Sequence, residues 1–156
     1  MPPNPPASRR RLLLWGFVAG FLAVPLFHQV MLTLLSAVDF TPRSPFPRDP
    51  TWPLGVPVWL SASFWGGIWG IIFASVDRWW PRGLGYFAAA LAFGAAGPTL
   101  VNWFVVMPLQ GAPVGSGWQP APMATGLLVN GAWGLGTGLF LRGADRWLGG
   151  KDIPSR

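Results

Sequence analysis

The chain alternates between long apolar runs and short segments that carry its charges. The apolar runs cover residues 12–38, 56–76, 84–107 and 122–141, and none of them contains Asp, Lys or Arg. Because about 20 mostly apolar residues suffice for a helix to cross a bilayer, each run predicts one spanning helix. The pattern therefore predicts an all-α fold, a four-helix transmembrane bundle, with a kink or tilt of the first helix, which contains Pro25. The third run contains Pro98.

The same runs divide the chain into three regions. We expect residues 1–11 to form a disordered cytoplasmic tail, residues 12–142 a four-span membrane domain, and residues 143–156 a second cytoplasmic tail. The first run follows Arg9, Arg10 and Arg11 as the apolar stretch of a signal peptide would. It is longer than the stretch of about 7–15 residues that such signals contain, so an uncleaved anchor is expected.

Glycine is concentrated at helical spacing in three of the runs. The fourth run is diluted by glycine and is expected to pack against the other helices rather than face lipid. Pairs of small residues four positions apart let two helices approach closely in a membrane. The predicted helix-packing pairs are Gly16 and Gly20, Gly66 and Gly70, and Gly134 and Gly138.

Composition excludes most other classes of protein. Hydrophobic residues make up 51% of the chain and charged residues 10%, whereas a soluble domain has about 25% charged residues. The chain has no Cys, no Glu and one His, and its five Asp all lie outside the apolar runs. We therefore expect no enzymatic activity, no metal site and no cofactor. The net charge of +6 does not indicate nucleic-acid binding, because the basic residues flank the spans.

The basic residues also predict an orientation. Nine of them fall in the N-terminal segment, the second loop and the C-terminal segment, and the other two, Arg43 and Arg48, fall in the first loop. Since Lys and Arg accumulate on the cytoplasmic side, this bias predicts a multi-pass protein of the bacterial inner membrane with both termini cytoplasmic.

The two halves of the sequence share several short patterns. We interpret them as a tandem repeat of two helical hairpins with a symmetry axis along the membrane normal; chance similarity between Gly- and Trp-rich helices is the alternative. The matched features are Pro25 and Gln29 with Pro98 and Asn102, Trp69-Gly70 with Trp133-Gly134, and Asp77-Arg78-Trp79 with Asp145-Arg146-Trp147.

The polar residues inside the runs lie mainly in the halves predicted to face outward. A polar group in hydrocarbon needs a partner within the protein, so these residues are candidates for one outward-opening cluster or for separate interhelical hydrogen bonds. His28 is the most specific candidate among them, because an imidazole can bind a cofactor or a quinone. The candidate binding residues are His28, Gln29, Ser61, Ser63, Asn102 and Asn130.

Phe27-His28-Gln29, the Trp-Gly patterns and Val101-Asn102-Trp103-Phe104 resemble small bacterial inner-membrane proteins with no known activity. The resemblance covers roughly residues 12–142 and implies four helices in the inner membrane. We expect a structural or accessory subunit that associates with other membrane subunits or with itself in the lipid bilayer. A small carrier or channel and a His28-based redox protein are the alternatives.

Overall fold

A computed structural model describes the backbone of residues 6–147 and the side chains of residues 9–144. Residues 1–5 and 148–156, which belong to the predicted tails, lie outside the described residues. The helical elements, in chain order, are α1 (Pro6–Ala23), η1 (Val24–His28), α2 (Gln29–Ala37), α3 (Val58–Ser75), η2 (Asp77–Trp79), α4 (Leu84–Val101), η3 (Asn102–Val106), α5 (Met107–Leu109), η4 (Val114–Trp118) and α6 (Pro120–Trp147).

The all-α prediction is confirmed, because the described chain is mostly helical. Its helices include four that are long and apolar enough to cross a membrane, as predicted: Arg9–Ala37, Val58–Ser75, Leu84–Leu109 and Pro120–Ala144. The first is α1, η1 and α2 joined end to end, and the third is α4, η3 and α5.

The helix ends differ from the ends of the apolar runs. α1 begins at Pro6, inside the segment predicted to be a disordered tail, and α6 continues to Trp147. Proline is tolerated in the first turn of a helix, and Arg and Leu have high helix propensity. An apolar run therefore indicates which part of a helix is suited to lipid, whereas polar residues can extend the helix beyond it.

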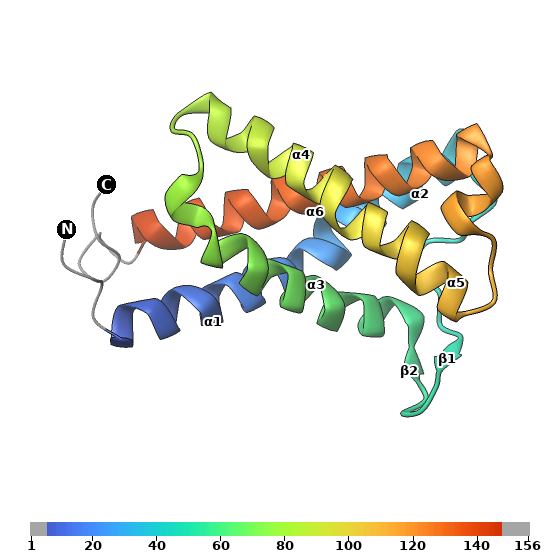
Figure 1. Cartoon of the computed structure of the whole chain (residues 1–156), viewed down its shortest axis with the longest axis horizontal. Coiled ribbons are helices and arrows are strands. Elements are labelled where there is room, and N and C mark those ends of the chain that lie inside the picture. Colours follow the sequence, from blue (N-terminus) through green and yellow to red (C-terminus); the bar gives the residue numbers. More distant parts are fainter. Residues whose placement is uncertain (1–5, 148–156) are drawn as a thin grey trace.

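The long helices associate as two hairpins (Figure 1). α1 packs along α3, α4 packs along α6, and α6 also packs against α1, η1 and α2. α6 is the most buried of the four, with 56% of its most apolar window inside the bundle, against 22–33% for the others. This confirms that the glycine-rich fourth run packs against other helices.

Both hairpins close on glycine. A Cβ at Gly16 would lie 2.6 Å from the carbonyl oxygen of Gly70, and one at Gly20 would collide with the carbonyl oxygen of Gly66. In the second hairpin, a Cβ at Gly134 would collide with the carbonyl oxygen of Ala90 and lie 2.8 Å from the Cα of Gly94. Backbone therefore meets backbone at each crossing. Gly138 differs, because its neighbours are side chains, at 3.1 Å and beyond.

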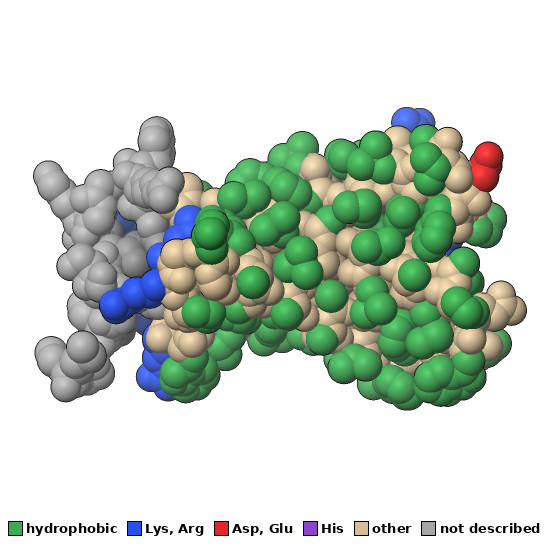
Figure 2. Space-filling view, turned by 90° about the horizontal axis from the view of Figure 1, so that it is seen from above, with side chains coloured by type: hydrophobic (Ala, Val, Ile, Leu, Met, Phe, Trp, Pro, Cys, Tyr) green, Lys and Arg blue, Asp and Glu red, His purple; other side chains and the backbone are tan. Residues whose placement is uncertain are grey.

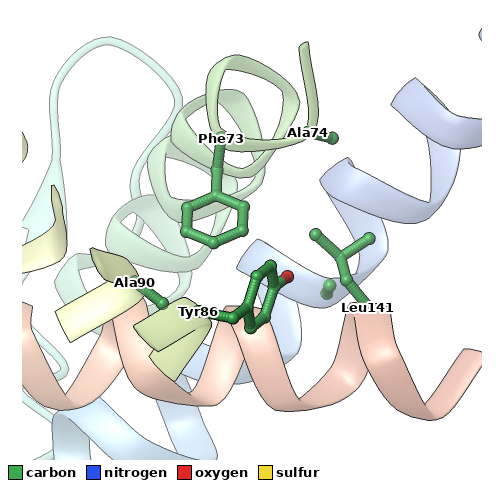
Figure 3. Packing of buried hydrophobic residues seen from close by; sticks show 6 residues of the cluster. Phe73, Ala74, Tyr86, Ala90 and Leu141 are labelled. Atoms are coloured by element: carbon green, nitrogen blue, oxygen red, sulfur yellow. The ribbon is translucent and has the colours of Figure 1, made fainter. Parts of the chain in front are cut away.

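An apolar cluster joins all four long helices near the end of the bundle where α1 begins and α6 ends. Ala19, Phe73, Ala74, Tyr86, Ala90 and Leu141 form it, and Figure 3 shows the rings of Phe73 and Tyr86 at its centre. Trp80 stacks on Phe73 with ring centroids 4.7 Å apart and donates a hydrogen bond from Nε1 to the carbonyl oxygen of Phe73. Aromatic packing therefore closes this end of the bundle.

The loops between the hairpin helices lie at the opposite end (Figure 1). The first contains a short antiparallel ladder, β1 (Pro50–Thr51) and β2 (Val56–Pro57), which the sequence did not predict. The hydroxyl of Thr51 donates to the carbonyl oxygen of Val56 at 2.9 Å, so the hairpin is closed by a side chain as well as by backbone.

Candidate functional site

Two π-helical turns interrupt the first and third long helices, and predicted site residues lie at both. η1 contains Pro25 and ends at His28, and the N–H of Gln29 donates to the carbonyl oxygen of Val24, five residues back. η3 begins at Asn102, four residues after Pro98. Proline has no N–H to donate within a helix, which explains the break at Pro25. α4, however, continues past Pro98 to Val101, and the π turn begins only at Asn102. Single π turns are frequent at functional sites.

Gln29 joins the first long helix to the loop that follows it. Its side chain is only 2% exposed, and its Oε1 accepts a hydrogen bond of 2.8 Å from the backbone N–H of Phe46. The ring of Phe46 in turn packs edge-on against Trp59 at the start of α3, with centroids 6.1 Å apart. Gln29 therefore fastens the loop of residues 38–57 to the bundle.

Replacing Gln29 by Leu is expected to loosen this loop. One net hydrogen bond of about 1 kcal/mol is lost, so the loop opens about fivefold more often. Trypsin cleavage after the exposed Arg43 and Arg48, followed by mass spectrometry of the detergent-solubilised protein, measures the change. Replacing the exposed Gln110 by Leu is the matched control. Equal cleavage of both variants and the wild type would contradict the role of Gln29.

Asn130 makes an interhelical link. Its Nδ2 donates to the hydroxyl of Thr99 at 2.9 Å, and that hydroxyl donates to the carbonyl oxygen of Gly126 at 3.3 Å. Thr99 is 1% exposed, so the chain of bonds lies inside the contact between α4 and α6. Thr99 could not be recognised from the sequence, because a single Thr in an apolar run is not distinctive and its partner is 31 positions away.

A double-mutant cycle measures this link. We expect Thr99→Val and Asn130→Leu to be coupled by about 0.6 kcal/mol, the usual size for a hydrogen bond between membrane helices. Unfolding in a denaturing detergent, with the wild type, both single variants and the double variant, gives the coupling. Strictly additive effects would mean that the two side chains do not interact.

The remaining candidates make no link between helices. Ser63 is fully buried, and its hydroxyl donates to the carbonyl oxygen of Trp59 in its own helix at 3.0 Å. Ser61 and Asn102 are half-buried. Within the described residues, no hydrogen bond joins two of the six predicted side chains. The structure thus shows a loop anchor, an interhelical link and a bond within one helix.

His28 differs from the other candidates, because one of its ring nitrogens, Nδ1, is buried without a hydrogen-bond partner among the described residues. The preceding Phe27 packs against α6, with its ring centroid 5.7 Å from that of Phe140. A buried polar atom without a partner costs about 1–3 kcal/mol. Among the described side chains of the six candidates, the Nδ1 of His28 is therefore the one buried polar atom without a hydrogen-bond partner.

Trp133 is a further buried polar contact that the sequence analysis did not single out. Its Nε1 donates to the carbonyl oxygen of Gly20 at 2.9 Å, and its side chain is 2% exposed. A Cβ added at Gly66 would lie 3.1 Å from the same nitrogen. Trp133 therefore joins α6 to the crossing of α1 and α3, and so joins the two hairpins. The sequence around Trp133 gives no sign of this hydrogen bond, because the two residues that it joins are 113 positions apart.

Basic side chains gather at the end of the bundle where α1 begins (Figure 2). Arg9 and Arg10 are exposed there. Near the same end, Arg142 lies over the ring of Tyr86 at 4.0 Å, a favourable cation–π contact. The side chains of residues 145–147, and with them the second Asp-Arg-Trp pattern, are outside the described side chains, as are Lys151 and Arg156.

The described residues contain no group of three or more His, Asp, Glu or Cys side chains placed to hold a metal ion. The polar chemistry described above is hydrogen bonding between neutral groups. Comparison with known proteins adds no family to this picture: no protein-family model, curated protein or solved structure matches the chain.

Proposed function

We propose that the protein spans the bacterial inner membrane four times, with both termini in the cytoplasm. The first long helix supports membrane insertion, because a branched aliphatic side chain is exposed at every fourth residue along it. Such a surface is unfavourable in water and suited to lipid. The exposed side chains are Leu14, Val18, Leu22, Leu26, Val30, Leu34 and Val38, each 40–72% accessible.

The charge distribution supports the orientation. Arg9, Arg10 and Arg11 lie near the start of α1. Arg78 and Arg82 lie in the turn between α3 and α4, at the same end of the bundle. Arg43 and Arg48 lie in the loop at the opposite end. Because Lys and Arg are retained on the cytoplasmic side, the end that carries α1 and the α3–α4 turn faces the cytoplasm.

Within the membrane the protein acts as a structural or accessory subunit without catalytic activity, in a larger complex or a homo-oligomer. One observation carries this proposal: the hydrogen bonds that the candidate side chains make are all to other groups of the same chain. Gln29 anchors a loop, Asn130 links two helices and Ser63 bonds its own helix. What the bundle offers to its surroundings is apolar helix surface, which suits contact with other membrane helices.

Native mass spectrometry of the complex extracted in mild detergent tests this role. The expected result is a defined assembly, either several copies of this chain or this chain with other membrane subunits in fixed ratio. A monomer under the mildest extraction that keeps the bundle folded would contradict the proposal.

A second candidate function is favoured by the unpartnered Nδ1 of His28. In this case the imidazole holds a cofactor or a quinone through that nitrogen. The test compares the purified wild type with His28→Phe for a bound chromophore and for quinone in the organic extract. A ligand present in the wild type and absent from the variant supports binding, and equal amounts in both exclude His28 as the ligand.

The two hairpins are also proposed to be a tandem repeat. The same backbone contact occurs once in each hairpin. Gly70 packs against the carbonyl oxygen of Gly16 in the first, and Gly134 packs against the carbonyl oxygen of Ala90 in the second. This register also pairs Trp69-Gly70 with Trp133-Gly134. Five positions separate Gly20 from Pro25, whereas four separate Gly94 from Pro98. Each copy also has one π turn close to its proline, η1 at Val24–His28 and η3 at Asn102–Val106.

A further inference from the structure

A groove runs between α1 and α6 on the surface of the bundle. Trp15, Val18 and Leu22 form one wall, and Leu139, Phe140 and Gly143 form the other. Its volume is about 280 Å³. Gly143 leaves open space at this wall, because a Cβ added there would have no atom within 4 Å. The groove belongs to the half of the bundle that contains the start of α1 and the end of α6.

Arginine residues lie beyond the end of the groove nearest the start of α1. Arg11 lies one helical turn before Trp15 on the same face of α1, because residues four apart are neighbours on a helix. Arg9 and Arg10 precede it and are exposed, and the first turn of α1 contains no acidic residue. An apolar groove with a cationic mouth therefore faces the cytoplasmic leaflet in the proposed orientation.

The size of the groove indicates what fits it. Small-molecule pockets range upward from about 300 Å³. A volume of about 280 Å³ has room for part of one hydrocarbon chain. Basic pockets between helices on the cytoplasmic side bind the headgroups of anionic lipids.

We propose that the groove binds one anionic phospholipid, with an acyl chain between α1 and α6 and its phosphate paired with the basic start of α1. The inference rests on the proposed placement in the membrane. The proposal adds a ligand class, a binding site and a membrane leaflet, and it assigns the groove between α1 and α6 a role in lipid recognition.

Lipid binding to the detergent-purified protein tests the proposal. Phosphatidylglycerol and phosphatidylcholine with identical acyl chains are titrated, and bound lipid is counted by native mass spectrometry. The wild type is expected to bind phosphatidylglycerol at least about fivefold more tightly, since one basic residue near a membrane surface contributes about that factor. Equal affinity for the two lipids would overturn the proposal.

Variants separate the two halves of the site. Arg11→Gln is expected to lower phosphatidylglycerol affinity about fivefold, whereas Arg82→Gln, an exposed arginine in the α3–α4 turn, leaves it unchanged. Gly143→Leu fills the groove from one wall and Val18→Phe from the other, and both are expected to displace the lipid. Ala88→Leu on the exposed face of α4 is the matched control for added size.

The possible failures are distinguishable. If both filling variants fold and still bind phosphatidylglycerol as the wild type does, the groove is not the site and the proposal is wrong. If Arg82→Gln weakens binding as much as Arg11→Gln, the lipid responds to total charge and the proposed site is again wrong. If the chain is recovered in the soluble fraction of a detergent-free lysate, the membrane placement itself fails, whatever the lipid titration shows.

Discussion

Replacing Gly20 by Leu is expected to abolish the folded bundle. The carbonyl oxygen of Gly66 and the Cα of Gly70 occupy the space that even a Cβ would need. These atoms belong to the backbone of α3, so the helices must separate rather than a side chain turn aside. Overpacking in a core costs about 1–3 kcal/mol where side chains can adjust, and here we expect more than that. Size-exclusion chromatography and thermal unfolding in detergent measure the loss.

Gly143→Leu is the matched control for Gly20→Leu. The substitution is the same, but nothing lies within 4 Å of the Cβ position at Gly143. This variant should elute and unfold as the wild type does. Wild-type behaviour of Gly20→Leu would mean that α1 and α3 do not cross at the glycines.

Removing the Trp133 side chain is expected to cost about 3–5 kcal/mol, the usual loss when a large buried aromatic is replaced by Ala. The indole is 2% exposed and packs with Ala23 and Val24 in a cluster that also contacts Phe140. It also joins the two hairpins, so Trp133→Ala should lower their cooperativity of unfolding. Unfolding by denaturing detergent, followed by circular dichroism, measures both effects.

Trp133→Phe separates packing from hydrogen bonding. It keeps most of the ring but cannot donate to the carbonyl oxygen of Gly20, and we expect a loss of about 1 kcal/mol. Trp52→Ala removes a side chain that is 95% exposed and serves as the control for loss of an indole. If Trp133→Ala and Trp52→Ala had equal effects, Trp133 would not be a junction between the hairpins.

The long helices could be predicted because a segment that is long and apolar enough to cross a membrane carries this signal in every residue. No charge occurs from residue 84 to 107, and the structure has continuous helical elements from Leu84 to Leu109. The burial of α6 followed from its glycines for a similar reason, since helix surfaces without large side chains pack closely. Helix ends carry no such signal, which explains why α1 begins at Pro6 rather than at residue 12.

The details of the polar contacts could not be predicted in the same way. Whether Asn130 bonds Thr99 or another group depends on the register between α4 and α6, which the backbone contact of Gly94 with Gly134 fixes. The partner of Gln29 is a backbone N–H in a loop, and sequence patterns do not mark backbone partners. The residue types were therefore recognisable as polar positions, but their partners required the packed bundle.

The π turns that interrupt the helices likewise have both a local and a non-local cause. Proline in an apolar run indicates a disturbed helix, and η1 does contain Pro25. At Pro98 the helix continues for three more residues before the π turn at Asn102. The position of a break depends on which carbonyl groups can rearrange their hydrogen bonds, and this depends on the neighbouring helices.

The membrane placement can be measured directly, because the chain contains no Cys and a single introduced thiol has no background. Leu54→Cys places the thiol at the exposed tip of the β1–β2 hairpin, and Arg82→Cys places it in the exposed turn between α3 and α4. With a membrane-impermeant maleimide on intact spheroplasts, Leu54→Cys should be labelled, and Arg82→Cys should be labelled only after lysis. Labelling of Arg82→Cys in intact spheroplasts, or protection of Leu54→Cys until lysis, would contradict the proposed four-span arrangement with cytoplasmic termini.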